Sequence, residues 1–101
     1  MIKHIILWKL NESLTDTEKE VVKKRMKTEL EALQDVIDGL VDIRVQIHGL
    51  PTSTADLMLD ATFTNKDALA AYAVHPAHVA VANGAVRPYT IQRSCLDYEV
   101  Q

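Results

Sequence analysis

The chain has 101 residues, of which 48% are hydrophobic and 25% charged, a composition typical of one globular domain, so we expect a single domain over residues 1–101. Its formal net charge is −3 and its largest basic cluster is Lys23 to Arg25. This excludes nucleic acid as an expected partner, because phosphate backbones require concentrated positive charge. The apolar runs are only a few residues long, far short of the roughly 20 residues of a transmembrane helix, so no membrane association is expected.

The N-terminal segment, residues 2–8, predicts a β-strand. It is too apolar for a surface strand, so we expect both of its faces to be covered. Because side chains alternate between the two faces of a strand, His4 points to the same side as Ile2, Ile6 and Trp8. A histidine on such a face is ordinarily a core residue with a satisfied hydrogen bond, and the alternative is a histidine that contacts a ligand.

A long amphipathic helix is predicted after the polar loop of residues 11–14. Thr15 and Glu18 have the spacing of a capping box, in which each side chain satisfies a free backbone N–H group at the helix start. Apolar residues then recur every three or four positions, and Gly39 supplies a left-handed cap at the end. The apolar stripe consists of Val22, Met26, Leu30, Leu33 and Ile37.

The second half of the chain predicts three strands and two short helices. Alternating polarity and turn-rich flanks mark the strands, and Asn65 is the predicted cap of the first short helix. The predicted elements are a strand over residues 41–48, a strand over 57–63, a helix over 66–74, a helix from Pro76 that stops at Gly84, and a strand over 89–99.

The order β-α-β-β-α-β predicts the ferredoxin-like α+β fold, an antiparallel sheet with helices on one face. The other sheet face then needs cover. The first and third strands carry apolar residues on both faces, so we expect a second copy of the chain to supply that cover. A two-fold homodimer in which two sheets close into a dimeric α/β barrel meets this need.

The cysteine content suggests a reducing compartment. Cys95 is the single cysteine of the chain, which excludes an intrachain disulfide. The N-terminus leads straight into strand-like sequence with no signal peptide, so we expect a cytoplasmic protein. Cys95 lies within the last predicted strand, where we expect a buried and chemically inert thiol.

The segment from Tyr72 to His78 places a phenol and two imidazoles around Pro76. These groups donate, accept and move protons near neutral pH. The proline disfavours helical backbone at His75 and favours a new helix start, so Tyr72 should lie near the end of one helix and His78 in the first turn of the next. The bend would direct both side chains into one volume, while His75 itself suits a structural role.

These features together resemble the stress-responsive A/B barrel domain (Dabb) family. The resemblance covers nearly the whole chain and implies a dimeric ferredoxin-like α+β barrel. Most members have no assigned activity, and some plant members are stress-induced and chaperone-like in behaviour. The resemblance is carried by residues 2–10, Phe63, Tyr72-x-x-His75-Pro76-x-His78 and Asp97-Tyr98.

One plant member of the family is a polyketide (olivetolic acid) cyclase, which catalyses an intramolecular aldol condensation with loss of CO2. Tyr72 and His78 fall on the positions of its tyrosine and catalytic histidine, and His4 matches a further pocket histidine. The resemblance thus implies Tyr72 and His78 as catalytic residues. This chain has Leu57 in place of another pocket histidine, and Val22, Lys23 and Met26 in place of an aromatic-lined helix face, which implies a different substrate. We expect a ligand pocket lined by His4, Ile6, Trp8 and Leu59.

Three functions are compatible with these residues. The first is a stress-associated homodimer that binds a small hydrophobic or keto-type ligand without established catalysis. The second is a cofactor-free enzyme in which His78 removes a proton next to a carbonyl and Tyr72 stabilises the enolate. The third is a relative of barrel monooxygenases that act with haem or on quinols. The alternative to any catalytic role is that Tyr72 and His78 only hold the bend together.

No cofactor or metal site is expected from the sequence. Pro76 breaks the helical spacing of His75 and His78, and no nearby cysteine or carboxylate completes a ligand set. A cation held by Asp60 and Asp97, meeting across the sheet at the subunit interface, is the remaining metal hypothesis. Trp8, Phe63 and Tyr98 either line a ligand cavity or pack in the core.

Overall fold

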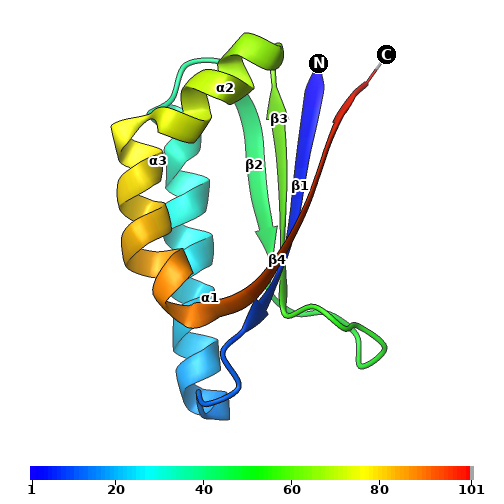
Figure 1. The fold of residues 1–101 in the computed structure, drawn as a ribbon, viewed down its shortest axis with the longest axis vertical. Helices are drawn as coiled ribbons and strands as arrows, with labels where there is room; N and C mark the ends of the chain where they lie inside the picture. The colour runs from blue at the N-terminus through cyan, green and yellow to red at the C-terminus, as the bar shows by residue number, and fades with distance from the viewer. Residues whose placement is uncertain (101) are drawn as a thin grey trace.

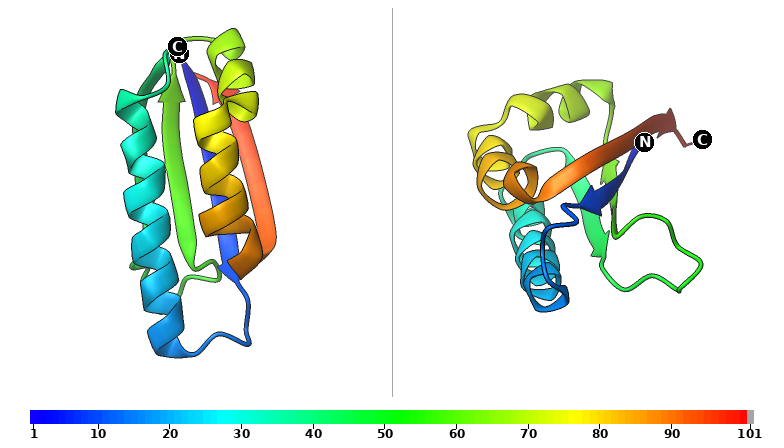
Figure 2. Two further views of the ribbon diagram at one scale, coloured as in Figure 1. Left: turned by 90° about the vertical axis from the view of Figure 1, so that its left-hand side faces the viewer. Right: turned by 60° about the horizontal axis from the view of Figure 1, so that its bottom comes forward.

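Four antiparallel strands form one sheet with all helices on one of its faces in the computed structural model, which describes residues 1–100 (Figure 1). The strand order is β2-β3-β1-β4, the ferredoxin-like topology that the sequence predicts. Figure 2 shows α1 and α3 side by side in front of the sheet. The elements are β1 (Ile2–Leu10), α1 (Asp16–Glu31), β2 (Leu40–Gln46), β3 (Leu57–Phe63), α2 (Lys66–Val74), α3 (Pro76–Val81) and β4 (Thr90–Glu99).

Helix α1 begins at the predicted capping box. The backbone N–H of Glu18 donates to Thr15 Oγ1 at 3.1 Å, and the Thr15 N–H donates to the Glu18 carboxylate at 2.9 Å. The α-helix ends earlier than predicted, at Glu31, and the chain continues as a 3₁₀ turn, Ala32–Asp35. Gly39 has the predicted positive φ, 84°, but it lies in the turn before β2 rather than at the helix end.

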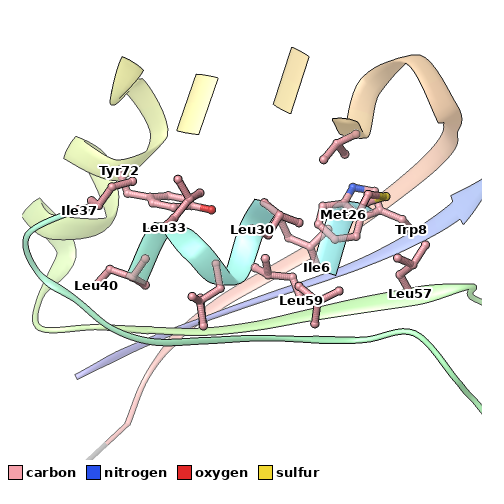
Figure 3. Close-up of a cluster of buried hydrophobic side chains, with 14 of the residues drawn as sticks. Ile6, Trp8, Met26, Leu30, Leu33, Ile37, Leu40, Leu57, Leu59 and Tyr72 are labelled. Carbon is pink, nitrogen blue, oxygen red and sulfur yellow. The ribbon is translucent and has the colours of Figure 1, made fainter. Parts of the chain in front are cut away.

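The core lies between α1 and the central strands (Figure 3). Leu30 of α1 meets Ile6 of β1 and Leu59 of β3 in the middle of the core. Trp8 packs beside Met26 at one end, and Tyr72 of α2 closes the opposite end. The core is built from the residues of the predicted apolar stripe and one face of β1, β2 and β3, together with Tyr72 and Val86.

The other face of the sheet is open in the single chain. Even-numbered residues of β1 are buried beneath the helices, as predicted, whereas odd-numbered residues are only half-buried or exposed. The expected cover on both faces is therefore not supplied within one chain. We call the residues on this side the open sheet face; its apolar members are Ile5, Leu7, Met58, Leu96 and Tyr98.

The last helical segment and β4 differ from the prediction. Helical backbone runs past Gly84 through a π-helical turn, Ala82–Val86, and a 3₁₀ turn, Arg87–Tyr89, because Gly84 does not adopt the positive φ of a helix stop. Strand β4 forms the sheet edge, and Cys95 on it is exposed rather than buried. Among residues 1–100, no helix has both the length and the apolar character needed to cross a membrane.

Candidate functional site

A cavity of about 380 Å³ lies between the sheet and the helices, and residues of α1, α2, α3 and the turns that follow α3 line its helical side. All of the predicted catalytic and ligand-binding residues lie on its wall. Whether they bind or react remains a prediction. The lining residues are His4, Ile6, Trp8, Leu30, Leu59, Leu69, Tyr72, Ala73, His78, Ala82, Val86, Arg87, Thr90 and Arg93.

The bend at Pro76 brings Tyr72 and His78 together. His75 has extended backbone (φ −65°, ψ 132°), as expected before a proline, and it ends α2 and caps α3. Its Nδ1 accepts a hydrogen bond from the Ala77 N–H at 3.0 Å, which supports a structural role for this histidine. The Tyr72 and His78 rings lie 4.2 Å apart between centroids, so the bend directs both into one volume.

His78 is oriented by the backbone of α2. Its Nδ1 lies 3.3 Å from the Ala73 carbonyl oxygen. Since a carbonyl only accepts, Nδ1 carries the hydrogen and Nε2 keeps its lone pair. Burial lowers the pKa of His78; positive charge at His4, Arg87 and Arg93 acts in the same direction, and the bond to Ala73 opposes it. The imidazole is therefore suited to accept a proton near neutral pH.

Tyr72 is a buried residue whose hydroxyl is available. Its side chain packs against Phe63 with ring centroids 4.9 Å apart, and the residue is only 2% exposed. No hydrogen bond joins its hydroxyl to another residue within 1–100, and the hydroxyl is not sealed from solvent, so it reaches the cavity. Burial raises the pKa of Tyr72 to about 12, so the phenol remains a hydrogen-bond donor across the physiological range.

His4 is the satisfied core histidine that the sequence predicts for this strand face, and contact with a ligand stays a prediction. It is 7% exposed, and its Nδ1 forms a short hydrogen bond with Asp97 Oδ1 on the neighbouring strand β4. It also lines the cavity, with its ring 6.2 Å from that of Tyr72. It is therefore a satisfied core histidine that also contributes to the cavity wall.

Two arginines on the cavity wall were missed. Arg93 shares the strand parity of Cys95 and Asp97 and is paired with Trp8 in the sheet register, so its position on the helix side could have been derived from the sequence. Arg87 was missed because the helix was expected to stop at Gly84. Neither arginine forms an ion pair with a carboxylate within residues 1–100, and none of the lining residues is acidic.

Other predicted residues are not brought together. Phe63 packs behind Tyr72 in the core, and Tyr98 lies on the open sheet face, so of the three aromatic candidates only Trp8 lines the cavity. Asp60 and Asp97 lie on opposite faces, because Asp60 shares the face of Ile5 while Asp97 contacts His4. The hypothesis of a cation held by these two carboxylates is therefore wrong.

The chain matches the model of the Stress responsive A/B Barrel Domain over residues 2–100. It belongs to the stress-responsive A/B barrel domain family. A dimeric protein of unknown function with a ferredoxin-like fold from Bacteroides fragilis NCTC 9343 is 36% identical, with a TM-score of 0.90 and alignment over 98% of this chain and 95% of that chain. These matches confirm the predicted family and fold.

More distant structures share the fold. A Dabb family protein from Mesorhizobium loti is 20% identical over 99% of this chain and 96% of its own, with a TM-score of 0.77. A hydroxynitrile lyase from Passiflora edulis is 12% identical over 99% of this chain and 93% of its own, with a TM-score of 0.80. No curated protein matches the chain. At these identities the two structures inform on the fold alone.

Proposed function

We propose that the protein is a homodimer that binds a small ligand, an apolar molecule with a keto or carboxylate head group, in the cavity of each subunit. The observation that carries the proposal is the composition of one cavity wall. Aliphatic and aromatic side chains surround a phenol, two imidazoles and two arginines, with no acidic residue among them. A few polar groups converging in an apolar cavity are typical of small-molecule sites.

The cavity volume limits the size of the ligand. Small-molecule sites range from about 300 to 1,000 Å³, and this cavity of about 380 Å³ lies near the lower end. A medium-chain or single-ring compound fits that space better than a macrocycle, so haem is not part of the proposal. Ile6, Leu30 and Leu59 would contact the apolar body of the ligand.

The charges on the wall favour an anionic or strongly polarised head group. Arg87 and Arg93 have no carboxylate partner within residues 1–100. Arg87 Nη1 donates to Asn83 Oδ1, and the remaining guanidinium N–H groups are available to a ligand. A guanidinium matches a carboxylate through two parallel hydrogen bonds. The Tyr72 hydroxyl, which lacks a hydrogen-bond partner within the described chain, would donate to a carbonyl or carboxylate oxygen at the same place.

The open sheet face supports a homodimer. Leu96 is 64% exposed and Tyr98 46% exposed, although both lie on a sheet face with Ile5 and Met58. Exposed apolar groups that are contiguous on one face ordinarily mark an interface. The Bacteroides fragilis relative is dimeric, which supports the same assembly here.

The free thiol of Cys95 suits a reducing compartment such as the cytoplasm.

A second candidate function, cofactor-free proton transfer, is favoured by the state of the two central side chains. His78 has a lowered pKa and a free Nε2 lone pair, so it can remove a proton from a carbon next to a carbonyl. Tyr72 keeps its proton and would donate a hydrogen bond to the enolate oxygen that develops. A hydroxynitrile lyase of the same fold indicates that the scaffold accommodates enzymes, without assigning residues here.

Calorimetric titration of the dimer with 3-oxooctanoate tests the binding proposal. Its chain length suits the cavity, and it carries both a keto and a carboxylate group. We expect one ligand per chain and weaker binding of the neutral methyl ester. Arg93→Gln and His78→Ala should each lose affinity at least tenfold, because a hydrogen bond to a charged group contributes about 1.5–3 kcal/mol. His48→Ala, which changes an exposed histidine outside the cavity, should bind unchanged.

The outcomes separate the two candidate functions. Affinity that is equal in the unaltered protein and all three variants, and equal for the acid and its ester, would overturn the ligand proposal. Deuterium exchange at carbon 2 of the bound keto acid that is faster than in buffer, and that is lost in His78→Ala and Tyr72→Phe, supports proton transfer. Binding without such exchange would leave a ligand-binding protein and exclude catalysis on this class of compound.

A further inference from the structure

Three potential metal ligands meet where β1 and β4 pair. His4 lies opposite Asp97 in the sheet register, and Cys95 lies opposite Ile6, so all three side chains project from one face of the two strands. One ligand atom of each lies within 4.8 Å of the others. We propose that His4, Cys95 and Asp97 bind a divalent transition metal ion of the zinc type. The argument for this site does not rest on the proposed ligand function, although His4 belongs to both sites.

Two of the three separations between the ligand atoms are close to those of a tetrahedral ion. Cys95 Sγ lies 3.8 Å from His4 Nδ1 and 3.6 Å from Asp97 Oδ1. With metal–sulfur bonds of about 2.3 Å and metal–nitrogen or metal–oxygen bonds of about 2.0–2.2 Å, tetrahedral ligands stand about 3.3–3.6 Å apart. Two of the three separations already lie at or near that range. The third, the hydrogen bond between Nδ1 and Oδ1, would lengthen to about 3.3 Å when an ion replaces its proton.

The same three residue types suggest a different assignment, a cysteine nucleophile with a histidine base and an orienting carboxylate. In such a relay the base uses one ring nitrogen toward the nucleophile and the other toward the carboxylate. Here Cys95 Sγ and Asp97 Oδ1 both approach Nδ1 of His4. Convergence of all three on one point suits a shared cation.

The donor set selects the class of ion. A thiolate, an imidazole and a carboxylate are all zinc ligands, and a three-residue set leaves a fourth position for water or a ligand. With Cys95 deprotonated, the set carries two negative charges, which match a divalent cation even though the Arg93 guanidinium lies beside the thiol. His4 also lines the cavity, so the ion would lie at the cavity edge.

The site has no local sequence motif. Cys95 and Asp97 are two residues apart on one strand, and His4 joins them only through the pairing of the first and last strands. The only metal ligands that the sequence suggested were the histidines around Pro76 and the Asp60–Asp97 pair. Only the strand register reveals that His4 faces Cys95 and Asp97.

Cobalt(II) is the probe that tests this proposal, because a cobalt–thiolate bond gives a charge-transfer absorption in the near ultraviolet. Titration of the reduced, intact protein should produce that band at one equivalent per chain, and zinc should abolish it by competition. Asp97→Asn keeps the thiol and alters an exposed carboxylate, so it should fold normally. We expect it to weaken cobalt binding about 100-fold or more, since even outer-shell partners contribute about 10–100-fold.

Further variants make the test decisive. His4→Gln should weaken binding similarly, and Cys95→Ser should abolish the band, while His48→Gln and Asp67→Asn, which lie outside the cluster, should titrate like the unaltered protein. An undiminished band in Asp97→Asn would mean that the exposed thiol binds cobalt without the other two residues. That result would overturn the proposal. Absence of any band in the unaltered protein would overturn it as well.

Discussion

Replacing Tyr72 with phenylalanine separates a functional hydroxyl from a structural one. The hydroxyl makes no hydrogen bond within residues 1–100, whereas the ring packs against Phe63 and lies 6.2 Å from the His4 ring. Phenylalanine keeps the ring and removes only the oxygen. We therefore expect Tyr72→Phe to change the free energy of unfolding by less than about 0.5 kcal/mol, because no bond is lost and no partner is left unsatisfied.

The alternative, in which Tyr72 only holds the bend together, gives a different magnitude. Loss of a real intramolecular hydrogen bond costs about 1 kcal/mol, and an orphaned buried partner costs about 1–3 kcal/mol. In a domain of this size, 1 kcal/mol lowers Tm by about 4–8 °C. Tyr72→Ala, which also removes the packed ring, should cost about 3–5 kcal/mol and shows that the assay detects packing at this position.

Urea denaturation at fixed protein concentration is the assay, since the stability of a dimer depends on concentration. The same variant should bind 3-oxooctanoate at least tenfold more weakly. Tyr89→Phe is a matched control, because Tyr89 lies outside the cavity beside Arg25. A stability loss of 1 kcal/mol or more in Tyr72→Phe, together with unchanged affinity, would refute the reasoning and establish a structural role.

Three further predictions concern backbone, pH and assembly. Gly39→Ala should lower the free energy of unfolding by more than about 2 kcal/mol, because φ is +84° and a Cβ would lie 2.6 Å from Ala68 Cβ. Gly84→Ala should leave the free energy of unfolding unchanged or raise it by up to about 1 kcal/mol. Urea midpoints measure both. The lowered pKa of His78 means that the unfolded chain binds its proton more readily, so Tm should fall as pH drops below about 6.5, with a smaller fall in His78→Gln. Leu96→Lys on the open sheet face should shift the dimer to monomer in light scattering, and a dimer of unchanged mass would contradict the use of this face.

Local signals in the sequence were sufficient for most of the fold. The Thr15–Glu18 capping box, the alternation along β1 and the proline-directed bend between Tyr72 and His78 each depend on neighbours within a few residues. Their predicted positions are those of the structure. The expected site residues, which the family resemblance implied, also lie on one cavity wall, although their roles stay predictions.

The wrong predictions concern features that are determined by tertiary contacts rather than by neighbouring residues. Gly84 looked like a helix stop, yet the chain stays helical there and packs against α1, with its missing Cβ position 3.6 Å from Arg25 Nη2. Cys95 is exposed because β4 is a sheet edge, which depends on strand order rather than on the residues around it. The cluster of His4 with Cys95 and Asp97 requires the register of strands separated by about the whole chain.

The central claim, that the cavity is a ligand site, is tested most directly by amide chemical-shift mapping of the dimer during titration with 3-oxooctanoate. The account predicts saturable shifts concentrated at Tyr72, Ala73, His78 and Arg93, which line the cavity, with little change in the loop of residues 47–56. Shifts that are absent, or that centre on other faces of the protein, would contradict it.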